Sequence, residues 1–544
     1  MSSEHVQVLF HGGNVITMED PVTTASADIA VGNGRILYVG DADTAMALAD
    51  SDTEVVDVKG KTMMPGLIDS HNHMVLFGQN LQLVDVNPLK AKNIEGLIKK
   101  LRERAEVTPP GDWVKAWGYD DTRMEDGRQV TREDLDEACP NHPVSLMRTC
   151  MHVMAVNSLA LEKAGIRKDT PEPEGGEIGR DSSGEPNGLL CELGAMNLVN
   201  RLIPYAEAEE CAYALKIASR VYAEQGLTTV TEAGAGWSGN PNEAAAFQIA
   251  WQNRELIPRV TLGLMEDTYS LLPDNGGTGL FSGFGDAFLK IGPAKFVADG
   301  GIGARTAALI EPYENSTDVG VMCETAEDLC KSMERAHDAG FQISVHAIGD
   351  RTIDMVLSAY EQILSKYPKP HRHRIEHVAV CRPEFFERIR KLGLITVVQP
   401  AFLHYLGDSF IQNLGERRIR YTIPIRTMLE KGLVVAGSSD RPVTEGSPWT
   451  GIWAAVNRRT VSGKDIAEKE RISVVDALKL YTTNGAFVNF EEDRVGSLTR
   501  GKFADIIVLE ENPLEIPPDR LKDIQVHMTW VGGQNVWNKG NNQP

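Results

Sequence analysis

The sequence has few cysteines and no thiolate motif. Its 544 residues include seven cysteines at scattered positions, and no CxxC pair occurs. An odd, scattered set argues against a disulfide framework and against a thiolate zinc site. This cysteine usage is typical of a protein from a reducing compartment.

Long apolar runs and an excess of basic residues are also missing. No segment approaches the roughly 18 apolar residues that a membrane helix needs, and the N-terminus lacks the basic and apolar regions of a secretory signal. Lys and Arg total 55 against 76 Asp and Glu, a formal net charge of −21. That balance argues against nucleic-acid and anionic membrane partners, which require clustered basic residues. We therefore expect a cytoplasmic protein that acts on a small molecule.

The length predicts several domains, or one large barrel with additions. The first sixty and the last fifty residues read as short strands broken by Gly, Asn and Asp. Because chain termini usually lie close together, residues 1–64 and 495–544 are predicted to build one small β-sandwich. Two separate β-pieces are the alternative.

The central region has a different rhythm. From about residue 207, helical patterns alternate with short apolar strands, which is typical of parallel β/α units. With "GLIDSHNH" as the first, eight such strands predict a (β/α)8 barrel, an α/β TIM-like fold, over 65–80 and 205–494. An open doubly wound sheet is the alternative, but no GxGxxG follows a strand. The long stretch 81–204 is predicted to be an insertion after strand one that forms a lid or substrate wall.

Ligand-type residues stand at the ends of several predicted strands. Side chains two apart on a strand share a face, so His71 and His73 of "LIDSHNHM" project together. Other strand ends supply Lys295, His346, His377 and Asp440. Imidazole and carboxylate are the ligands that Zn²⁺ and similar metals prefer. Because barrel active sites lie at the carboxyl ends of the strands, these residues predict a centre for one or two divalent metals.

A second HxH pair tests this reasoning. His371 and His373 precede their strand in "PHRHRIEH" and so belong to the opposite end of the barrel. We expect His371 at the surface, His373 in the core or behind the ligands, and His377 as the ligand. Of the other histidines, His142 and His337 are expected to be exposed to solvent.

Substrate contacts are harder to assign from sequence. His152 in the insertion and His404 after strand seven are candidates. Trp117 and Tyr119 cluster with Trp113 in the insertion, where aromatic rings either form an apolar substrate wall or build the insertion's own core. Three arginines are candidates for pairing with a substrate carboxylate: Arg123, Arg148 and Arg441.

Many of these stretches resemble the amidohydrolase superfamily, in the amidohydrolase-3 branch that includes N-substituted formamide deformylase-like enzymes. The matching stretches are "PGLIDSHNH", "DWVKAWGYDD", "HVMAVNSLAL", "GEPNGLL", "KFVADGGIGARTAAL", "VHAIGDR", "RIEH", "SSDRPV" and "VGSLTRGKFADIIVL". They span nearly the whole chain in the expected order. The resemblance implies a metal-dependent (β/α)8 hydrolase with a bipartite β-sandwich.

The resemblance also implies a division of the ligands. His71 and His73 would bind a buried metal, and His346 and His377 would bind a second, more exposed one. Asp440 would contact a metal and take a proton from the bound water.

Lys295 would bridge two metals after reacting with CO₂ to form a carbamate. An unmodified ammonium has three donors and no acceptor, so it does not ligate a cation. An ordinary lysine beside a single metal is the alternative.

The expected reaction is hydrolysis of a non-peptide C–N bond, with zinc as the expected metal and Asp440 as general base. Backbone N–H groups of "DGGIGA" (299–304), or His152, are candidates for the oxyanion; a simple tight turn is the alternative for the loop. A deaminase is the nearest rival, but the HxxE pattern is altered because the acid is Asp350, one residue later. An ester or lactone hydrolase and a non-catalytic regulatory homologue are further alternatives. The sequence leaves open whether the chain forms a homo-oligomer.

Overall fold

The structure is a computed structural model that describes residues 5–88, 90–121, 124–148, 153–173, 176–237, 239–266, 268 and 279–540. It divides into two compact units, one of Met1–Gly78 with Glu207–Pro544 and one of Gln79–Ala206. The predicted insertion, 81–204, begins two residues after the start of the second unit and ends two residues before its end. Every helix among the described residues is too short or too polar to span a membrane.

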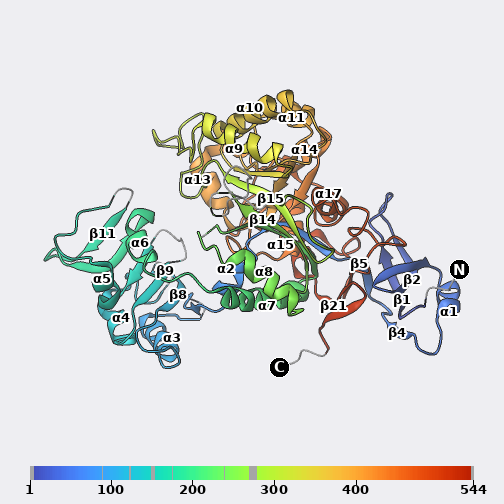
Figure 1. Cartoon of the computed structure of the whole chain (residues 1–544), viewed down its shortest axis with the longest axis horizontal. Coiled ribbons are helices and arrows are strands. Elements are labelled where there is room, and N and C mark those ends of the chain that lie inside the picture. Colours follow the sequence, from blue (N-terminus) through green and yellow to red (C-terminus); the bar gives the residue numbers. More distant parts are fainter. Residues whose placement is uncertain are drawn as a thin grey trace. The chain divides into compact units, whose positions relative to one another are not determined.

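The larger unit contains a nearly closed parallel barrel, which confirms the predicted fold class (Figure 1). Its strands follow the order β19-β18-β17-β16-β15-β14-β13-β6. They are β6 (Leu67–Asn72), β13 (Leu227–Ala235), β14 (Arg259–Met265), β15 (Leu289–Val297), β16 (Ile343–Ala347), β17 (Arg374–His377), β18 (Ile395–Val398) and β19 (Val435–Gly437). β13 and β14 are buried along their whole length, as expected for parallel strands covered on both faces. The two end strands meet where Asp440 N donates to His71 O at 2.8 Å.

Helices connect and cover these strands. They are α2 (Met74–Asn80), α7 (Ala208–Glu224), α8 (Glu243–Gln252), α9 (Ala326–Asp338), α10 (Asp350–Lys366), α11 (Pro383–Lys391), α12 (Pro400–Tyr405), α13 (Gly407–Ile419), α14 (Ile425–Glu430), α15 (Pro448–Asn457), α16 (Val474–Leu480) and α17 (Thr483–Val488). α7 is representative: Leu215, Ser219 and Tyr222 recur at helical spacing and are buried. Such a stripe faces the core and fixes the helix against the sheet.

Both chain ends build one eight-stranded sheet, in agreement with the predicted domain from the two termini. Its strands are β1 (Val8–Ile16), β2 (Thr24–Gly32), β3 (Arg35–Gly40), β4 (Glu54–Asp57), β5 (Thr62–Pro65), β20 (Ile506–Leu509), β21 (Val526–Val531) and β22 (Gln534–Asn538), with helix α1 (Ala42–Leu48) after β3. β20 pairs antiparallel with β5, which joins the C-terminal strands to the N-terminal ones. Phe10 and Trp530 pack edge to face in the core of this sheet.

The second unit has its own sheet and its own apolar core. Its strands are β7 (Val84–Asp85), β8 (Val114–Tyr119), β9 (Val144–Arg148), β10 (Val153–Val156), β11 (Glu177–Arg180) and β12 (Pro186–Cys191), and its helices are α3 (Ile94–Ala105), α4 (Arg132–Ala138), α5 (Ser158–Ala164) and α6 (Glu192–Asn200). Leu97, Leu101 and Leu146 belong to one core cluster of this unit. A separate core is the mark of a folded domain rather than of an extended loop.

Candidate metal centre

Six side chains predicted as ligands meet at the carboxyl ends of the barrel strands. They are His71 and His73 at the end of β6, Lys295 in β15, His346 in β16, His377 in β17 and Asp440 after β19. Five are buried and His346 is partly buried. The ring of His377 lies 4.9 Å from that of His71 and 4.4 Å from that of His346, centre to centre. The structure therefore brings together residues that lie up to 369 positions apart in the chain.

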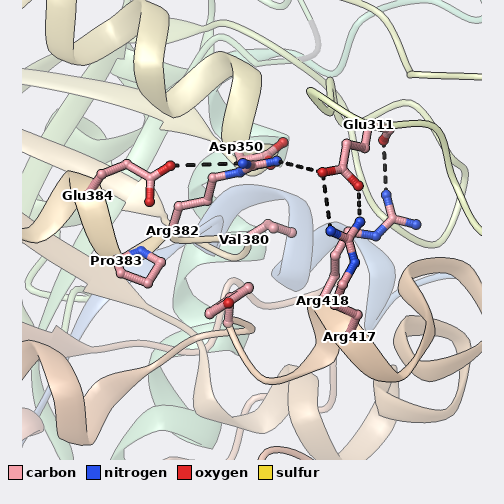
Figure 2. Close-up of a pocket in the computed structure, with 9 residues that line it drawn as sticks. Glu311, Asp350, Val380, Arg382, Pro383, Glu384, Arg417 and Arg418 are labelled. Carbon is pink, nitrogen blue, oxygen red and sulfur yellow. Dashed lines mark hydrogen bonds and ion pairs between the residues drawn. The ribbon is translucent and has the colours of Figure 1, made fainter.

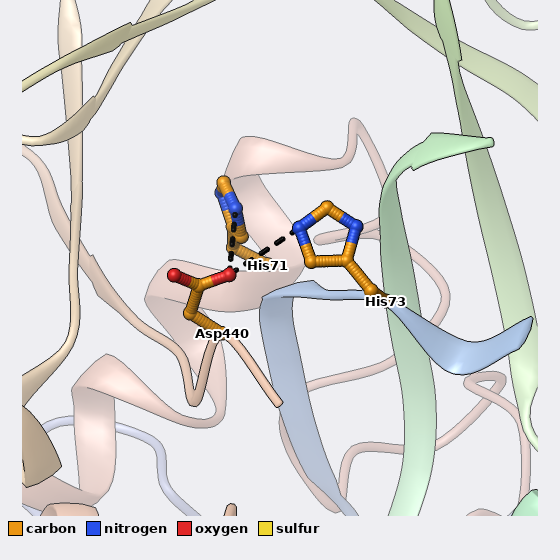
Figure 3. A group of neighbouring side chains, drawn as sticks. All are labelled: His71, His73 and Asp440. Atoms are coloured by element: carbon orange, nitrogen blue, oxygen red, sulfur yellow. Dashed lines mark ion pairs between the residues drawn. The ribbon is translucent and has the colours of Figure 1, made fainter. Parts of the chain in front are cut away.

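His71, His73 and Asp440 form the tightest group (Figure 3). The Asp440 Oδ1 atom lies 3.4 Å from Nε2 of His71 and 3.4 Å from Nε2 of His73. One ligand atom from each residue lies within 4.8 Å of the others. Two imidazoles and one carboxylate around a common point are a donor set that suits a divalent metal.

Two of the histidines donate their Nδ1 proton to a side-chain oxygen. His71 Nδ1 lies 2.5 Å from Glu376 Oε2, and His377 Nδ1 lies 2.8 Å from Gln399 Oε1. An Nδ1–H donor leaves the Nε2 lone pair of each ring free. Partners of this kind fix the tautomer and the ring orientation of metal-binding histidines.

The other two histidines are held differently. His346 donates from Nε2 to Gly300 O at 3.2 Å, so its Nδ1 atom carries the free lone pair. His73 Nδ1 lies 3.4 Å from Glu232 Oε1, within ion-pair distance but without the alignment of a hydrogen bond. Each of the four rings thus has an oxygen beside one nitrogen, and the second nitrogen of His71 and of His73 faces Asp440 Oδ1.

Left-handed backbone aims two of the candidate ligands. His377 has φ 72° and Asp440 has φ 52°, a region that non-glycine residues rarely adopt. Neighbours in a strand point to opposite faces, yet both Glu376 and His377 contact His71. The left-handed turn at His377 reconciles these contacts, because it redirects the side chain at the end of β17. Strain of this kind concentrates at functional sites.

The charges around the centre are strongly coupled. Burial acts to raise the pKa of Asp440, but the neighbouring His71 and His73 outweigh it and hold the value well below its usual range. Burial acts to lower the pKa of His73, while Asp440 and Glu232 outweigh it and raise the value to about 9. Burial and the charge of Lys295 lower the pKa of His346 to about 3. The site therefore presents anionic carboxylate and neutral His346 at neutral pH.

Lys295 is a buried cation without a hydrogen-bond partner. Its exposed fraction is 1%, and Nζ has no acceptor. Burial lowers its pKa to about 8. Burying an ammonium without a hydrogen-bond partner is energetically unfavourable. A further group beside Lys295 Nζ would supply that partner. The donor set that fits a divalent metal is the one formed by His71, His73 and Asp440, whose ligand atoms lie within 4.8 Å of one another.

The sequence did not reveal the oxygen atoms that hold the histidines. Glu376, Glu232 and Gln399 lie in or next to barrel strands, as the predicted ligands do. Glu376 is also bound by the guanidinium of Arg374 and, at 2.7 Å, by the hydroxyl of Ser344. The motif "RIEH" contains this glutamate, and an acid inside an otherwise buried strand was an available signal.

The second HxH pair, His371 and His373, lies at the amino ends of β16 and β17. His373 is buried there, as expected, and His371 stacks on it with ring centres 4.5 Å apart. The predicted exposure of His337 and His142 was wrong, because both are buried. Inside the protein, His337 Nδ1 forms a hydrogen bond with His373 Nε2 at 2.7 Å. His142 Nδ1 forms one with Asp112 O at 3.2 Å.

Several predicted substrate contacts have other partners. Arg441 is buried, its guanidinium lies 4.3 Å above the Phe77 ring, and Nε donates to Glu445 O. Its pairing with a substrate carboxylate stays a prediction. His404 is partly exposed and turns Nδ1 to Arg459 O at 3.1 Å. Its ring contacts Tyr405 and Trp453, and its role in substrate binding stays a prediction.

The aromatic pair of the insertion belongs to the second unit. Tyr119 lies in the core of that unit and donates its hydroxyl to Gln129 at 3.1 Å, while Trp117 is partly buried. Arg148 is paired with Asp120 and Asp121. Two further candidates, His152 and Arg123, lie outside the described residues.

The loop after β15 and the acid after β16 serve the scaffold. Gly301 N donates to Thr306 Oγ1 at 3.0 Å, which favours the tight turn predicted as the alternative for "DGGIGA". Asp350 accepts from Ile310 N at 2.8 Å and from Arg382 Nε at 2.6 Å. In Figure 2 this carboxylate lines a cavity of about 120 Å³ among other ion pairs. Asp350 thus has two hydrogen-bond partners within the protein, and the deaminase alternative stays untested by these contacts.

Comparison with known proteins gives concordant matches. A family model described as "Amidohydrolase family" matches residues 54–537. The chain is 30% identical to an N-substituted formamide deformylase of Arthrobacter pascens over 539 residues, 96% of each chain. It is 30% identical to the protein LONG AFTER FAR-RED 3 of Arabidopsis thaliana over 545 residues, 97% of this chain and 91% of that one. A crystal structure of an uncharacterized metal-dependent hydrolase from Pyrococcus furiosus matches with a TM-score of 0.78 and 29% identity, over 93% of this chain and 100% of that one.

Proposed function

The chain belongs to the amidohydrolase family and is a metal-dependent hydrolase, and from that premise we propose that it cleaves the carbon–nitrogen bond of a small amide. The observation that carries the proposal is the common arrangement of the four histidines: each has one nitrogen beside an oxygen, and the second nitrogen of His71 and of His73 faces Asp440 Oδ1. The full-length match to an N-substituted formamide deformylase supports an amide as the substrate.

We assign one or two metal ions to His71, His73, His346, His377 and Asp440, and to Lys295 once it is carboxylated, with zinc as the expected ion. When bound, the metal lowers the pKa of a water molecule and polarises the substrate carbonyl. These buried residues would hold it, and Glu376 and Gln399 keep His71 and His377 in the tautomer with the proton on Nδ1.

Asp440 is the proposed general base. It is a carboxylate at neutral pH, it is buried, and its Oδ1 atom faces the two histidines of β6. It takes the proton from the attacking water and returns it to the nitrogen of the leaving amine. That return matters because an unprotonated amine is a poor leaving group.

Lys295 is proposed to react with CO₂. The neutral amine attacks the carbon of CO₂, a C–N bond forms as one C–O π bond opens onto oxygen, and one Nζ proton passes to solvent, so that the amine becomes a carbamate with two oxygen acceptors. The lowered pKa of about 8 supports this step, because it raises the fraction of free amine near neutral pH above that of an ordinary lysine. The absence of a hydrogen-bond partner for Nζ supports it as well.

A substrate screen with the zinc-loaded protein tests the reaction. The panel contains N-substituted formamides, longer N-acyl amines, cyclic amides, lactones and an aminopurine. We expect turnover of amides, measured as release of the primary amine. Turnover confined to lactones, or ammonia release from the aminopurine, would replace the amide proposal with an esterase or a deaminase.

The Lys295→Ala variant tests the carbamate. We expect it to lose metal and activity and to regain part of both when a short-chain carboxylate is added. Unchanged metal content would remove Lys295 from the proposed ligands.

A further inference from the structure

A cavity of about 440 Å³ lies in the larger unit, outside the candidate metal centre. It is lined by residues from the end of α7, the end of α12, the start of α15, the segment 522–526 and the strand β22. None of the six candidate metal ligands is among them. Pockets of this size hold small molecules in many proteins. The chemistry of the lining decides which kind of molecule fits.

Three polar side-chain atoms of the lining are buried without a hydrogen-bond partner. They are Nε1 of Trp449, Nε1 of Trp537 and Oε1 of Gln225. Trp449 is only 2% exposed, so bulk water does not serve its N–H. Burying a donor or an acceptor without a partner is energetically unfavourable, and native proteins contain few such atoms. Two donors and one acceptor at one cavity indicate an occupant that itself offers both an acceptor and a donor.

A neighbouring tryptophan on α15 shows how such an indole is satisfied within the protein. Trp453, four residues after Trp449, is 5% exposed, and its Nε1 donates to Asp519 O at 3.1 Å. Trp449 is buried just as deeply but lacks this bond. Of these two indoles, only that of Trp449 lines the cavity. The unpaired N–H is therefore a property of the cavity and not of the helix as a whole.

The start of α15 favours an anionic group on one side of the cavity. Ser447 is the N-cap residue of this ten-residue helix, its side chain makes no capping bond, and it lines the cavity together with Trp449 and Thr450. The first backbone N–H groups of a helix have no partner within the helix and attract anions. Together with the indole N–H of Trp449, this helix start suits a carboxylate.

The lining also contains acceptors. One is Gln225 Oε1, and the carboxylate of Glu224 comes directly before it in the chain. Another belongs to His404, which the sequence suggested as a substrate contact and which lines this cavity. Its Nδ1–H donates to Arg459 O, so the neutral ring keeps an acceptor at Nε2. An ammonium group supplies donors for acceptors of this kind.

The exposed charges of the lining are of both signs. The cations are Lys522 and Lys539, and the anions are Glu224, Glu445 and Asp523. A simple anion would face three carboxylates, and a simple cation would face two lysines and the positive end of a helix. A molecule that carries both charges avoids either conflict.

We propose that this cavity binds a small zwitterion, a free polar α-amino acid, as a ligand separate from the substrate of the metal centre. Its carboxylate accepts hydrogen bonds from the indole N–H groups at the start of α15, and its ammonium donates to Gln225 Oε1. Hydrogen bonds to charged groups are the stronger ones. The binding breaks no bond and does not depend on the proposed amide hydrolysis, so each proposal is tested without the other.

Calorimetry on the zinc-loaded protein tests the class of ligand. The probes are L-serine, 3-hydroxypropanoate, which lacks the amino group, and ethanolamine, which lacks the carboxylate. We expect saturable binding of L-serine, and binding of each of the other two that is weaker by about tenfold or more. Equal affinity for 3-hydroxypropanoate would make this an anion site and overturn the proposal. The absence of saturable binding with glycine, L-serine and L-glutamine alike would overturn it as well.

Three Trp→Phe variants test the location. Trp449→Phe removes the unpaired N–H and keeps an aromatic ring, so we expect the affinity for L-serine to fall about tenfold. Trp537→Phe should act in the same direction and, being partly exposed, serves if Trp449→Phe does not fold. Trp453→Phe is the matched control, because its N–H is already bonded to Asp519 O. It should change the affinity less than twofold.

The comparison is made among variants whose zinc content and circular dichroism match those of the wild type. An unchanged affinity for L-serine in Trp449→Phe and Trp537→Phe would place the amino acid elsewhere, for example on the metal, and would overturn the proposal. An equal loss in Trp453→Phe would also overturn it, because the effect would then come from packing and not from the unpaired N–H.

Discussion

The barrel carries a histidine pair of the same spacing at each of its two ends. At the carboxyl end, His71 and His73 face Asp440, and each has a glutamate beside its Nδ1. At the amino end, the contacts of His373 run to backbone and to another histidine: Ile343 N donates to its Nδ1 at 3.0 Å, and its Nε2 pairs with His337.

Proton positions explain why the two ends differ. At the amino end, Ile343 N–H fixes the lone pair of His373 on Nδ1, so Nε2–H donates to His337 Nδ1, and His337 donates from Nε2 to Tyr367 O at 2.9 Å. Every nitrogen of these two rings is used within the protein. At the carboxyl end, the second nitrogen of His71 and of His73 faces Asp440 Oδ1. The HxH spacing alone therefore does not indicate a metal site. The hydrogen-bond partners of the rings decide whether the pair is structural or can bind a metal.

The largest expected effect comes from Asp440, the carboxylate beside the histidine pair at the carboxyl end of the barrel. Asp440→Asn removes the base but keeps the size and an oxygen of the side chain, so we expect kcat to fall by about 10²–10⁴-fold while most of the metal remains. Asp350→Asn is the matched control, since Asp350 is a buried acid at the same end that pairs with Arg382. It should affect the free energy of unfolding more than kcat. Retained turnover in Asp440→Asn would eliminate the general-base role.

A smaller effect is expected from Glu232, the carboxylate beside Nδ1 of the candidate ligand His73. Glu232→Gln removes the charge beside His73 Nδ1, and loss of such a partner usually weakens metal binding by about 10–100-fold. The zinc dissociation constant is measured by competition with a chromophoric chelator. Glu243→Gln, another buried acid that follows β13 but bonds to Gly236 N, serves as the control. An identical zinc affinity in both variants would show that Glu232 does not support the centre.

The buried histidines His337 and His373 at the amino end should make the stability of the fold depend on pH. Burial lowers the pKa of His337, and burial with the nearby His371 lowers that of His373 well below the usual value. The unfolded chain therefore binds protons below about pH 6.5 that the folded chain does not accept, and stability falls as the pH drops. The expected slope is at most about 1.4 kcal/mol per pH unit for each histidine.

Urea unfolding at pH 7 and pH 5 measures this slope. Because other buried groups titrate as well, the informative quantity is the difference between the wild type and His373→Gln. The wild type should lose more stability than the variant over this range. Equal losses would mean that the imidazole pair is not the acid-sensitive element.

The candidate ligands could be named from the sequence, whereas the residues that hold them could not. His71, His346 and Asp440 were identifiable because residue type and strand end together indicate a metal site. Glu376 bonds to His71 across 305 positions, and which residues face one another across a barrel depends on stagger and strand tilt. His337 was wrongly placed although the pattern of α9 contained the answer, since Met333 and Leu329 precede it at helical spacing on the buried face.

We infer that the partners of the histidines, rather than the HxH spacing, create the metal centre. The direct test is the zinc content per chain of two double variants, His71→Gln with His73→Gln and His371→Gln with His373→Gln, by inductively coupled plasma mass spectrometry after dialysis. We expect the first variant to lose its zinc and the second to retain the wild-type amount. Equal zinc content in the two variants would contradict it.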